Sequence, residues 1–141
     1  MPHSITTLAF AAAFVLAAGT PIAAQSASTP QVIAIYFPSG KAELTEQALA
    51  VIDETAKLAR EQPSTQIVVV GRTDSSGSDE TNDRIAMERA TNTRDALIER
   101  DIDPANVTVI SRPAREARGT PDNFITERRA DVIISPTATS L

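Results

Sequence analysis

The feature that most constrains the fold of this chain is a regular alternation between short runs of apolar, β-branched residues and longer segments with helical periodicity. Four runs are short enough to be strands, at residues 32–37, 66–70, 107–110 and 130–134. Two segments between them, residues 44–60 and 79–100, repeat their apolar residues every three or four positions. The predicted order is therefore β-α-β-α-β-β. Its β-α-β units imply parallel strands joined by right-handed crossovers.

The boundaries and burial of these elements can also be predicted. Residues 32–37 show no alternation with polar residues, which favours a strand buried on both faces with Tyr36 in the core. Thr45 is a suitable N-cap for the first helix, and Gln62 followed by Pro63 is a suitable end. The residues expected on the buried face of this helix are Ala48, Leu49, Ile52, Ala56 and Ala59.

The first 24 residues differ from the rest of the chain. They contain an apolar stretch followed by small residues, which is typical of a secretory signal peptide cut after Ala24. An uncut membrane anchor is the alternative, but the apolar stretch is shorter than the ~20 residues that a membrane span needs. We therefore expect a signal peptide at 1–24, a linker at 25–31, one domain at 32–135 and a flexible tail at 136–141. Export, and no membrane span after cleavage, follow from this division.

Composition excludes several classes of function. The chain of 141 residues has a net charge of −5, which argues against nucleic acid as a partner because phosphate binding needs a cationic face. It has no cysteine, and its only histidine is His3, so thiolate and imidazole sites for metals or catalysis are unavailable in the expected domain. A small hydrolase would need a placed pair of carboxylates, and none stands out. We expect a protein that is not an enzyme, with no cofactor and no metal.

One polar segment, residues 71–90, carries the candidate binding residues. Asp74 follows the second predicted strand, at the strand end where open α/β sheets bind ligands. Asn82 and Arg89 are seven residues apart and so share one face of the second helix. An aspartate accepts hydrogen bonds from an ammonium group, and an arginine fork donates two to a carboxylate. Asp74 and Arg89 together could therefore hold the zwitterionic head group of a free amino acid.

Two other roles for Asp74 and Arg89 remain open at this point. The two residues could bond to each other, or they could cap the helix, and neither role would require a ligand. Arg84 has glutamates four residues before and after it, as expected for a solvated ion pair, whereas Arg89 has no acid at these offsets. We therefore expect the partner of Arg89 to lie outside its own helix.

The same segment resembles the signature of the OmpA C-terminal-like, peptidoglycan-associated domain family. The residues that match this signature in register are Thr73, Asp74, Gly77, Asn82, Ile85, Arg89, Ala90 and Leu97. The sequence YFPSGKAEL before the first helix is similar to the opening of the family, and ERRADVII near the C-terminus is similar to its last strand. The resemblance extends over residues 32–134.

The resemblance implies a fold and a ligand. The fold would be a single α+β or α/β domain, with a mixed sheet and two helices packed on one of its faces. The ligand would be peptidoglycan, bound through the diaminopimelate head group of its stem peptide. Asp74 would take the ammonium group, Arg89 the carboxylate, and Thr73 and Asn82 would add hydrogen bonds, with Arg128 on the same rim. The expected location is the periplasm, in association with the outer membrane or the cell wall.

The chain also departs from the family pattern around this site. Arg72 stands where the family often has histidine, Pro38 and Ser39 replace the usual opening residues, and Glu127 replaces an asparagine. These changes favour an alternative, in which a divergent domain has lost wall binding and acts as a periplasmic protein–protein adaptor. Under either interpretation, a protein partner in the outer membrane or the periplasm would supply any membrane tether.

Overall fold

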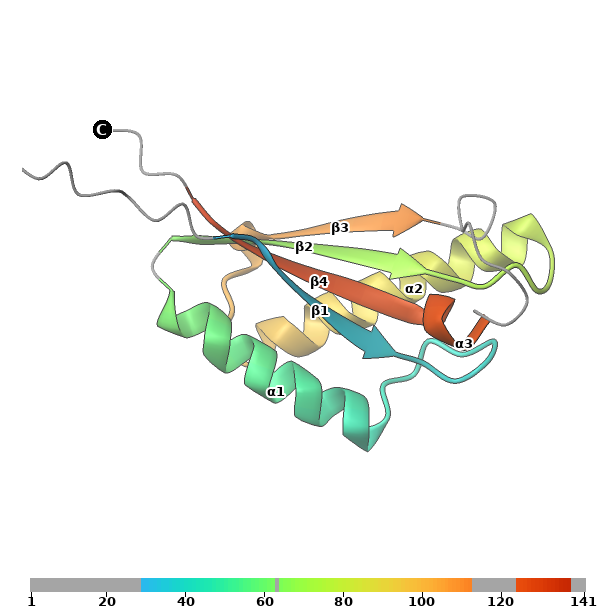
Figure 1. The fold of residues 1–141 in the computed structure, drawn as a ribbon, viewed down its shortest axis with the longest axis horizontal. Helices are drawn as coiled ribbons and strands as arrows, with labels where there is room; N and C mark the ends of the chain where they lie inside the picture. The colour runs from blue at the N-terminus through green and yellow to red at the C-terminus, as the bar shows by residue number, and fades with distance from the viewer. Residues whose placement is uncertain (1–28, 63, 113–123, 138–141) are drawn as a thin grey trace, which may run out of the picture.

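The computed structural model describes residues 29–62, 64–112 and 124–137. The predicted signal peptide lies outside these residues, as do most of the predicted linker and tail. The elements in chain order are β1 (Gln31–Tyr36), α1 (Glu46–Glu61), β2 (Thr65–Arg72), α2 (Asp79–Ile98), a 3-10 turn (Pro104–Asn106), β3 (Val107–Arg112), α3 (Phe124–Glu127) and β4 (Arg129–Pro136). The predicted order of the long elements is confirmed, and α3 adds a single helical turn before the last strand (Figure 1).

The four strands form one mixed sheet in the order β1-β4-β2-β3. The last strand, β4, lies between β1 and β2 and is antiparallel to both, whereas β2 and β3 are parallel neighbours. The strands β1 and β2 therefore run in the same direction without touching. Helices α1 and α2 cover one face of this sheet, as the family resemblance implies (Figure 1).

The core lies between the sheet and the two helices. On the first helix, Ala48, Ile52, Ala56 and Ala59 are buried as predicted, and Leu49 packs against them from a half-buried position. The Thr45 hydroxyl accepts a hydrogen bond from the Ala48 amide at 3.1 Å, which confirms the predicted N-cap. None of the helices among the described residues has the length and apolarity that crossing a membrane would require.

The prediction that the first strand is buried on both faces is wrong. Because β4 inserts between β1 and β2, β1 becomes an edge strand, and only its helix-facing side is covered. Val32 is 63% exposed and Tyr36 is 52% exposed, whereas Ile35 is fully buried. Tyr36 therefore belongs to the open face of the sheet and not to the core.

Helix α2 is the element that connects the core to the candidate site. Four positions of its three-to-four-residue repeat, Ala86, Ala90, Thr93 and Leu97, are all buried, and Asn82 and Arg89 lie on the same buried face. The helix begins after Ser78, whose hydroxyl accepts from the Thr81 amide. The loop between β2 and this cap brings Thr73 and Asp74 next to the first turns of α2.

Candidate functional site

A pocket of about 210 Å³ lies where β2 ends and α2 begins. Four of the five residues predicted as ligand-binding line it: Thr73, Asp74, Asn82 and Arg89. The other lining residues are Ser39, Gly40, Ser76, Gly77, Thr81 and Ile85. The fifth predicted residue, Arg128, is not part of this lining but contacts one of its members. The sequence motif therefore does converge on one cavity.

Asp74 is only 6% exposed, and its carboxylate is held from two sides. One oxygen, Oδ1, accepts from the Ser76 amide at 3.0 Å and from the Ser76 hydroxyl. The other, Oδ2, accepts from Nε of Arg128 in an ion pair. Burial acts to raise the pKa of Asp74, but the hydrogen bonds from Ser76 and Arg128 outweigh it and hold this pKa below its ordinary value. Asp74 is therefore ionised at neutral pH.

Arg89 is 1% exposed, and its guanidinium group donates to three backbone carbonyls. Nε donates to Lys41 at 2.8 Å, Nη1 to Arg72 at 2.8 Å and Nη2 to Pro38 at 3.1 Å. The guanidinium carbon also lies 5.3 Å from the centre of the Phe37 ring. The expectation that its partner lies outside α2 is confirmed, and the partners are main-chain oxygens of the β1–α1 loop and of the end of β2.

Within the part of the chain that the structure describes, Arg89 has no carboxylate in direct contact. Among the described residues no ion pair involves Arg89, and its interaction with Asp74 is electrostatic only. Desolvation by burial lowers the pKa of Arg89 to about 10, although the charge of Asp74 acts to raise it. A direct Asp74–Arg89 bond, which was one alternative from the sequence, is absent in this part of the chain. A guanidinium has five N–H groups, and three are used here, so one remains on each terminal nitrogen.

Thr73 and Asn82 complete the predicted group. Both are buried in the wall of the pocket. The Thr73 hydroxyl has no hydrogen-bond partner within the described residues, although Thr73 is only 2% exposed. Buried hydroxyls without a partner are rare in folded proteins, because leaving one unpaired costs about 1–3 kcal/mol. An unpaired hydroxyl in the lining of a pocket is the arrangement expected of a group that meets a ligand.

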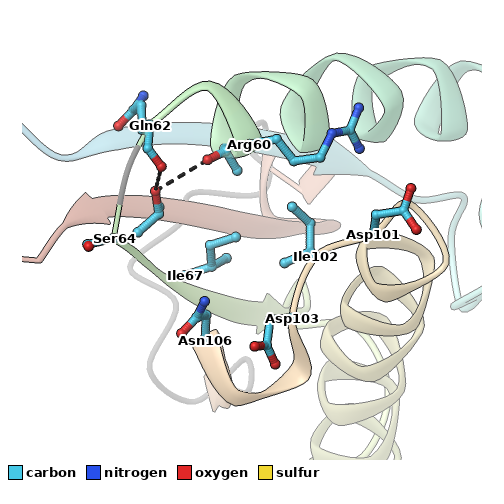
Figure 2. Close-up of a pocket in the computed structure, with 10 residues that line it drawn as sticks. Arg60, Gln62, Ser64, Ile67, Asp101, Ile102, Asp103 and Asn106 are labelled. Atoms are coloured by element: carbon cyan, nitrogen blue, oxygen red, sulfur yellow. Dashed lines mark hydrogen bonds between the residues drawn. The ribbon is translucent and has the colours of Figure 1, made fainter.

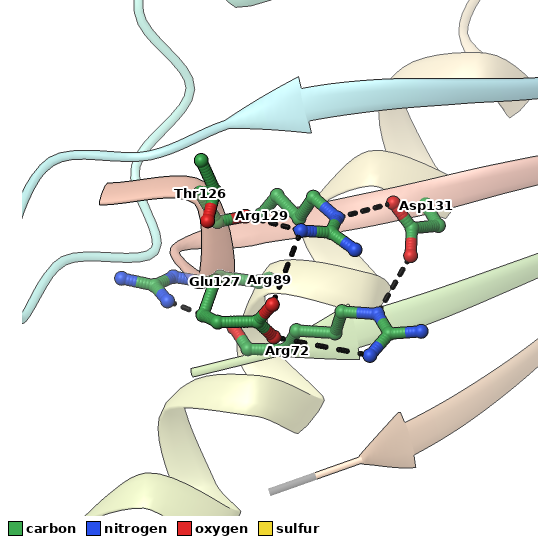
Figure 3. Close-up of polar contacts among 6 residues, drawn as sticks. All are labelled: Arg72, Arg89, Thr126, Glu127, Arg129 and Asp131. Atoms are coloured by element: carbon green, nitrogen blue, oxygen red, sulfur yellow. Dashed lines mark hydrogen bonds and ion pairs between the residues drawn. The ribbon is translucent and has the colours of Figure 1, made fainter. Parts of the chain in front are cut away.

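Beside the pocket lies a ring of four charged side chains that sequence reasoning missed. Arg72 donates to Asp131 at 2.6 Å, and Arg129 donates to the same carboxylate at 2.7 Å. Glu127 lies 3.9 Å from Arg72 and 3.5 Å from Arg129, which closes the ring (Figure 3). Charges alternate around it, and Asp131 is buried. Glu127 therefore faces two arginines and does not belong to the lining of the pocket.

A second pocket, of about 220 Å³, lies at the opposite end of the sheet, where α1 and α2 end (Figure 2). It holds none of the predicted site residues. The buried Thr65 hydroxyl in its wall donates to the carbonyls of Gln62 at 2.9 Å and Ala59 at 3.3 Å. Within the described residues, this pocket has no unpaired buried side-chain nitrogen or oxygen, unlike the pocket at Asp74. We therefore assign the candidate site to the pocket at Asp74.

We expect Asp74 to make the stability of the domain depend on acid. Its pKa in the folded protein lies below the ordinary value of 3.8, so its contribution is present above that pH and is lost as the pH falls through the lower, folded pKa. Urea unfolding of the wild type and of Asp74→Asn at a series of pH values tests this. The stability difference between the two proteins should be constant near neutrality and should shrink below pH 3.8. A difference that stays constant through the acid range would contradict the expectation.

Comparison with known proteins identifies the family of the chain. The model of the OmpA family matches residues 36–132, which is most of the chain. The chain belongs to the OmpA family. The match includes every residue of the candidate site, from the β1–α1 loop to Arg128.

Two curated relatives of this OmpA-family domain are longer proteins. This chain is 29% identical over 105 residues to the probable lipoprotein YiaD of Escherichia coli, and the match covers 72% of this chain and 48% of the relative. It is 32% identical over 97 residues to outer membrane porin F of Pseudomonas aeruginosa, covering 68% of this chain and 27% of the porin. The chain thus spans about half or less of the length of these relatives.

Solved structures show the same fold. The peptidoglycan-associated lipoprotein of Burkholderia pseudomallei has a TM-score of 0.66 and is 25% identical, over 72% of this chain and 89% of that one. The C-terminal domain of Helicobacter pylori MotB has a TM-score of 0.68 at 19% identity, over 75% and 86% of the two chains. At that identity, the likeness to MotB supports the fold alone.

Proposed function

We propose that this OmpA-family domain binds peptidoglycan non-covalently, through the diaminopimelate head group of the stem peptide. The observation that carries this proposal is that Asp74 and Arg89 line one pocket without being bonded to each other. A buried guanidinium without a carboxylate partner costs free energy in the unbound protein, so a role in binding gives a reason for its presence. The lipoprotein of Burkholderia pseudomallei, with the same fold, is named for its association with peptidoglycan.

Each of the five predicted site residues has a chemical role in this proposal. Asp74 takes the ammonium group of the ligand, and the two unused N–H groups of Arg89 take its carboxylate. The unpaired hydroxyl of Thr73 and the amide of Asn82 add hydrogen bonds, and Arg128 borders the site through its contact with Asp74. Each charge-assisted hydrogen bond contributes about 1.5–3 kcal/mol, so a few such contacts support a specific interaction of moderate strength.

The proposed location is the cell envelope, and within it the periplasm. The relatives include a probable lipoprotein and an outer membrane porin, which supports this location. We propose a binding role without catalysis, because the described residues contain no cluster of acidic or histidine side chains suited to a metal, and the pocket holds a single carboxylate. We also propose a protein of the outer membrane or periplasm as a partner.

A second candidate function is that of a periplasmic protein–protein adaptor. It is favoured by the open face of the sheet, where Val32, Tyr36 and Ile110 are exposed on the side that the helices leave uncovered. Val32 and Tyr36 lie on one edge strand of this face and Ile110 on the other, and exposed apolar residues that join into a patch mark interaction surfaces. An adaptor that uses this face would not require the pocket at Asp74, so substitutions in the pocket separate the two candidates.

Sedimentation with purified peptidoglycan tests the proposal. We expect the wild type to sediment with the wall material, and Asp74→Ala to bind about 10- to 100-fold more weakly, as the loss of one charge-assisted contact implies. The matched control is Asp95→Ala, which removes an exposed carboxylate on the outer side of α2 that pairs with Arg94. This control should bind like the wild type. Wild-type protein that stays in solution, or Asp74→Ala protein that sediments like the wild type, would contradict the proposal.

A further inference from the structure

We propose that Arg128 determines the specificity of this pocket. Because Arg128 pairs with Asp74, the pocket binds the carboxylate group of a ligand more strongly than its ammonium group. This inference deepens the proposed function and relies on it for the identity of the natural ligand. It concerns which half of the zwitterion dominates binding in this chain. The contacts of Asp74, the support behind Arg128 and the charge that remains in the pocket each bear on it.

The first observation is that the acceptor positions of Asp74 are largely taken. Ser76 donates twice to Oδ1, and Arg128 donates to Oδ2. The Arg128 side chain is thus placed where the ammonium group of a ligand would bind. An incoming ammonium must either displace Arg128 or share Oδ2 with it. Its gain is therefore smaller than it would be at a free carboxylate.

The second observation is that Arg128 is held in place from both sides along the chain. Its neighbours, Glu127 and Arg129, are both members of the charged ring with Arg72 and Asp131 (Figure 3). The carbonyl of Arg128 also accepts from the Phe37 amide at 2.8 Å. The backbone at residue 128 is therefore anchored, which opposes any large withdrawal of this side chain from Asp74.

The third observation is the charge that remains. One carboxylate, that of Asp74, lies beside two guanidinium groups. Asp74 pairs with Arg128, and Arg89 has no ion-pair partner among the described residues. The pocket therefore carries a net positive charge. Thr81 and Asn82, near the start of α2, lie in the lining at the positive end of the helix dipole. Asp79 and Glu80 in the first turn offset part of this dipole, but neither belongs to the lining.

The unpaired hydroxyl of Thr73 is an independent sign of a ligand site. It is buried in the same lining, and it can donate to an anionic oxygen at no loss of an existing bond. Together with the two unused N–H groups of Arg89, it gives the pocket donors suited to one carboxylate. By contrast, the only anionic acceptor in the lining is already neutralised by Arg128.

Three small probes with related carbon chains separate the two halves of the zwitterion. Diaminopimelate has both ammonium and carboxylate groups, pimelate has only the carboxylates, and cadaverine has only the ammonium groups. Binding is followed by NMR, through the backbone amide signals of Gly77 and Asn82. For the wild type we expect diaminopimelate to shift these signals at the lowest concentrations and pimelate at about tenfold higher ones, the effect of the weakened contact with Asp74. We expect cadaverine to require at least about tenfold more than pimelate, because it lacks the carboxylate contacts.

Two substitutions tie this preference to the residues named. Arg128→Met should lower the ratio of pimelate affinity to cadaverine affinity by about tenfold or more, because it frees Asp74 and removes one positive charge. Thr73→Val should weaken pimelate binding by about tenfold or more, the value of one hydrogen bond to a charged group, without lowering the melting temperature. Arg84→Ala on the exposed side of α2 is the control for both.

The binding of the three small probes tests the inference separately from the binding of peptidoglycan. Cadaverine that binds the wild type as well as pimelate does, or an Arg128→Met protein with an unchanged preference, would overturn it. Absence of pimelate binding by the wild type would overturn it too. If Arg128→Met does not fold, Thr73→Val serves instead, and unchanged pimelate binding by that variant would also overturn the inference. Selective pimelate binding without sedimentation on peptidoglycan would instead leave the inference standing and reject the proposed wall ligand.

Discussion

Replacement of Arg89 by methionine is expected to destabilise the domain by about 2–4 kcal/mol and to abolish ligand binding, because one guanidinium serves both purposes. Its three carbonyl acceptors belong to two separate segments, Pro38 and Lys41 of the β1–α1 loop and Arg72 at the end of β2. Methionine fills a similar volume but donates nothing, so these segments would lose their common attachment to α2. Ser39 and Gly40, which line the pocket, lie between two of the acceptors.

The measurement is chemical unfolding of the purified domain, with ligand binding assayed below the unfolding transition. Arg84→Met is the matched control, since Arg84 lies on the exposed side of the same helix and, within the described residues, pairs with Glu88 alone, at 2.7 Å. We expect the control to change stability by at most about 0.5 kcal/mol. If Arg89→Met were as stable as this control, Arg89 would not organise the loop. If it also kept full binding, its role in the pocket would be excluded.

Much of the fold follows from local sequence patterns. The period of the apolar residues predicts both long helices, and the Thr45 cap and the buried line of α2 are where the sequence places them. Local rules succeed here because each helix buries one continuous face. The same rules predict that Asn82 and Arg89 share a face, and the motif around Asp74 predicts that these residues meet at one site.

The misjudged features depend on contacts between distant segments. The strand order could not be predicted from periodicity, so the insertion of β4 between β1 and β2, and with it the exposure of Tyr36, was missed. The acceptors of Arg89 are backbone oxygens, which no side-chain pattern reveals. The pairing of Arg128 with Asp74 joins residues 54 positions apart. One available signal was the unusual run of charges from Glu127 to Asp131, which forms the ring with Arg72.

Substitution of Gly71 by alanine is expected to have an equally large effect, because the backbone of α2 lies close against β2 at this residue. A Cβ atom on Gly71 would lie 1.7 Å from the Ala86 carbonyl oxygen and 3.1 Å from the Ala90 side chain. The first of these atoms belongs to the helix backbone and cannot rotate away, so the whole helix would have to shift. Overpacking of this kind costs about 1–3 kcal/mol where side chains can adjust, and we expect at least the upper end here.

The shift of α2 should also reach the binding site, since Asn82 and Arg89 lie on either side of Ala86 on the same helix. We therefore expect Gly71→Ala to lose both stability, measured by chemical unfolding, and affinity for the diaminopimelate-containing ligand. Gly40→Ala is the stability control: a Cβ atom there meets no atom within 4 Å, and only the positive φ of 65° opposes it. Its cost should be about 1–2 kcal/mol. Equal stability losses in the two variants would show that helix–strand contact at Gly71 is looser than the close approach implies, and that α2 is positioned mainly by its polar bonds.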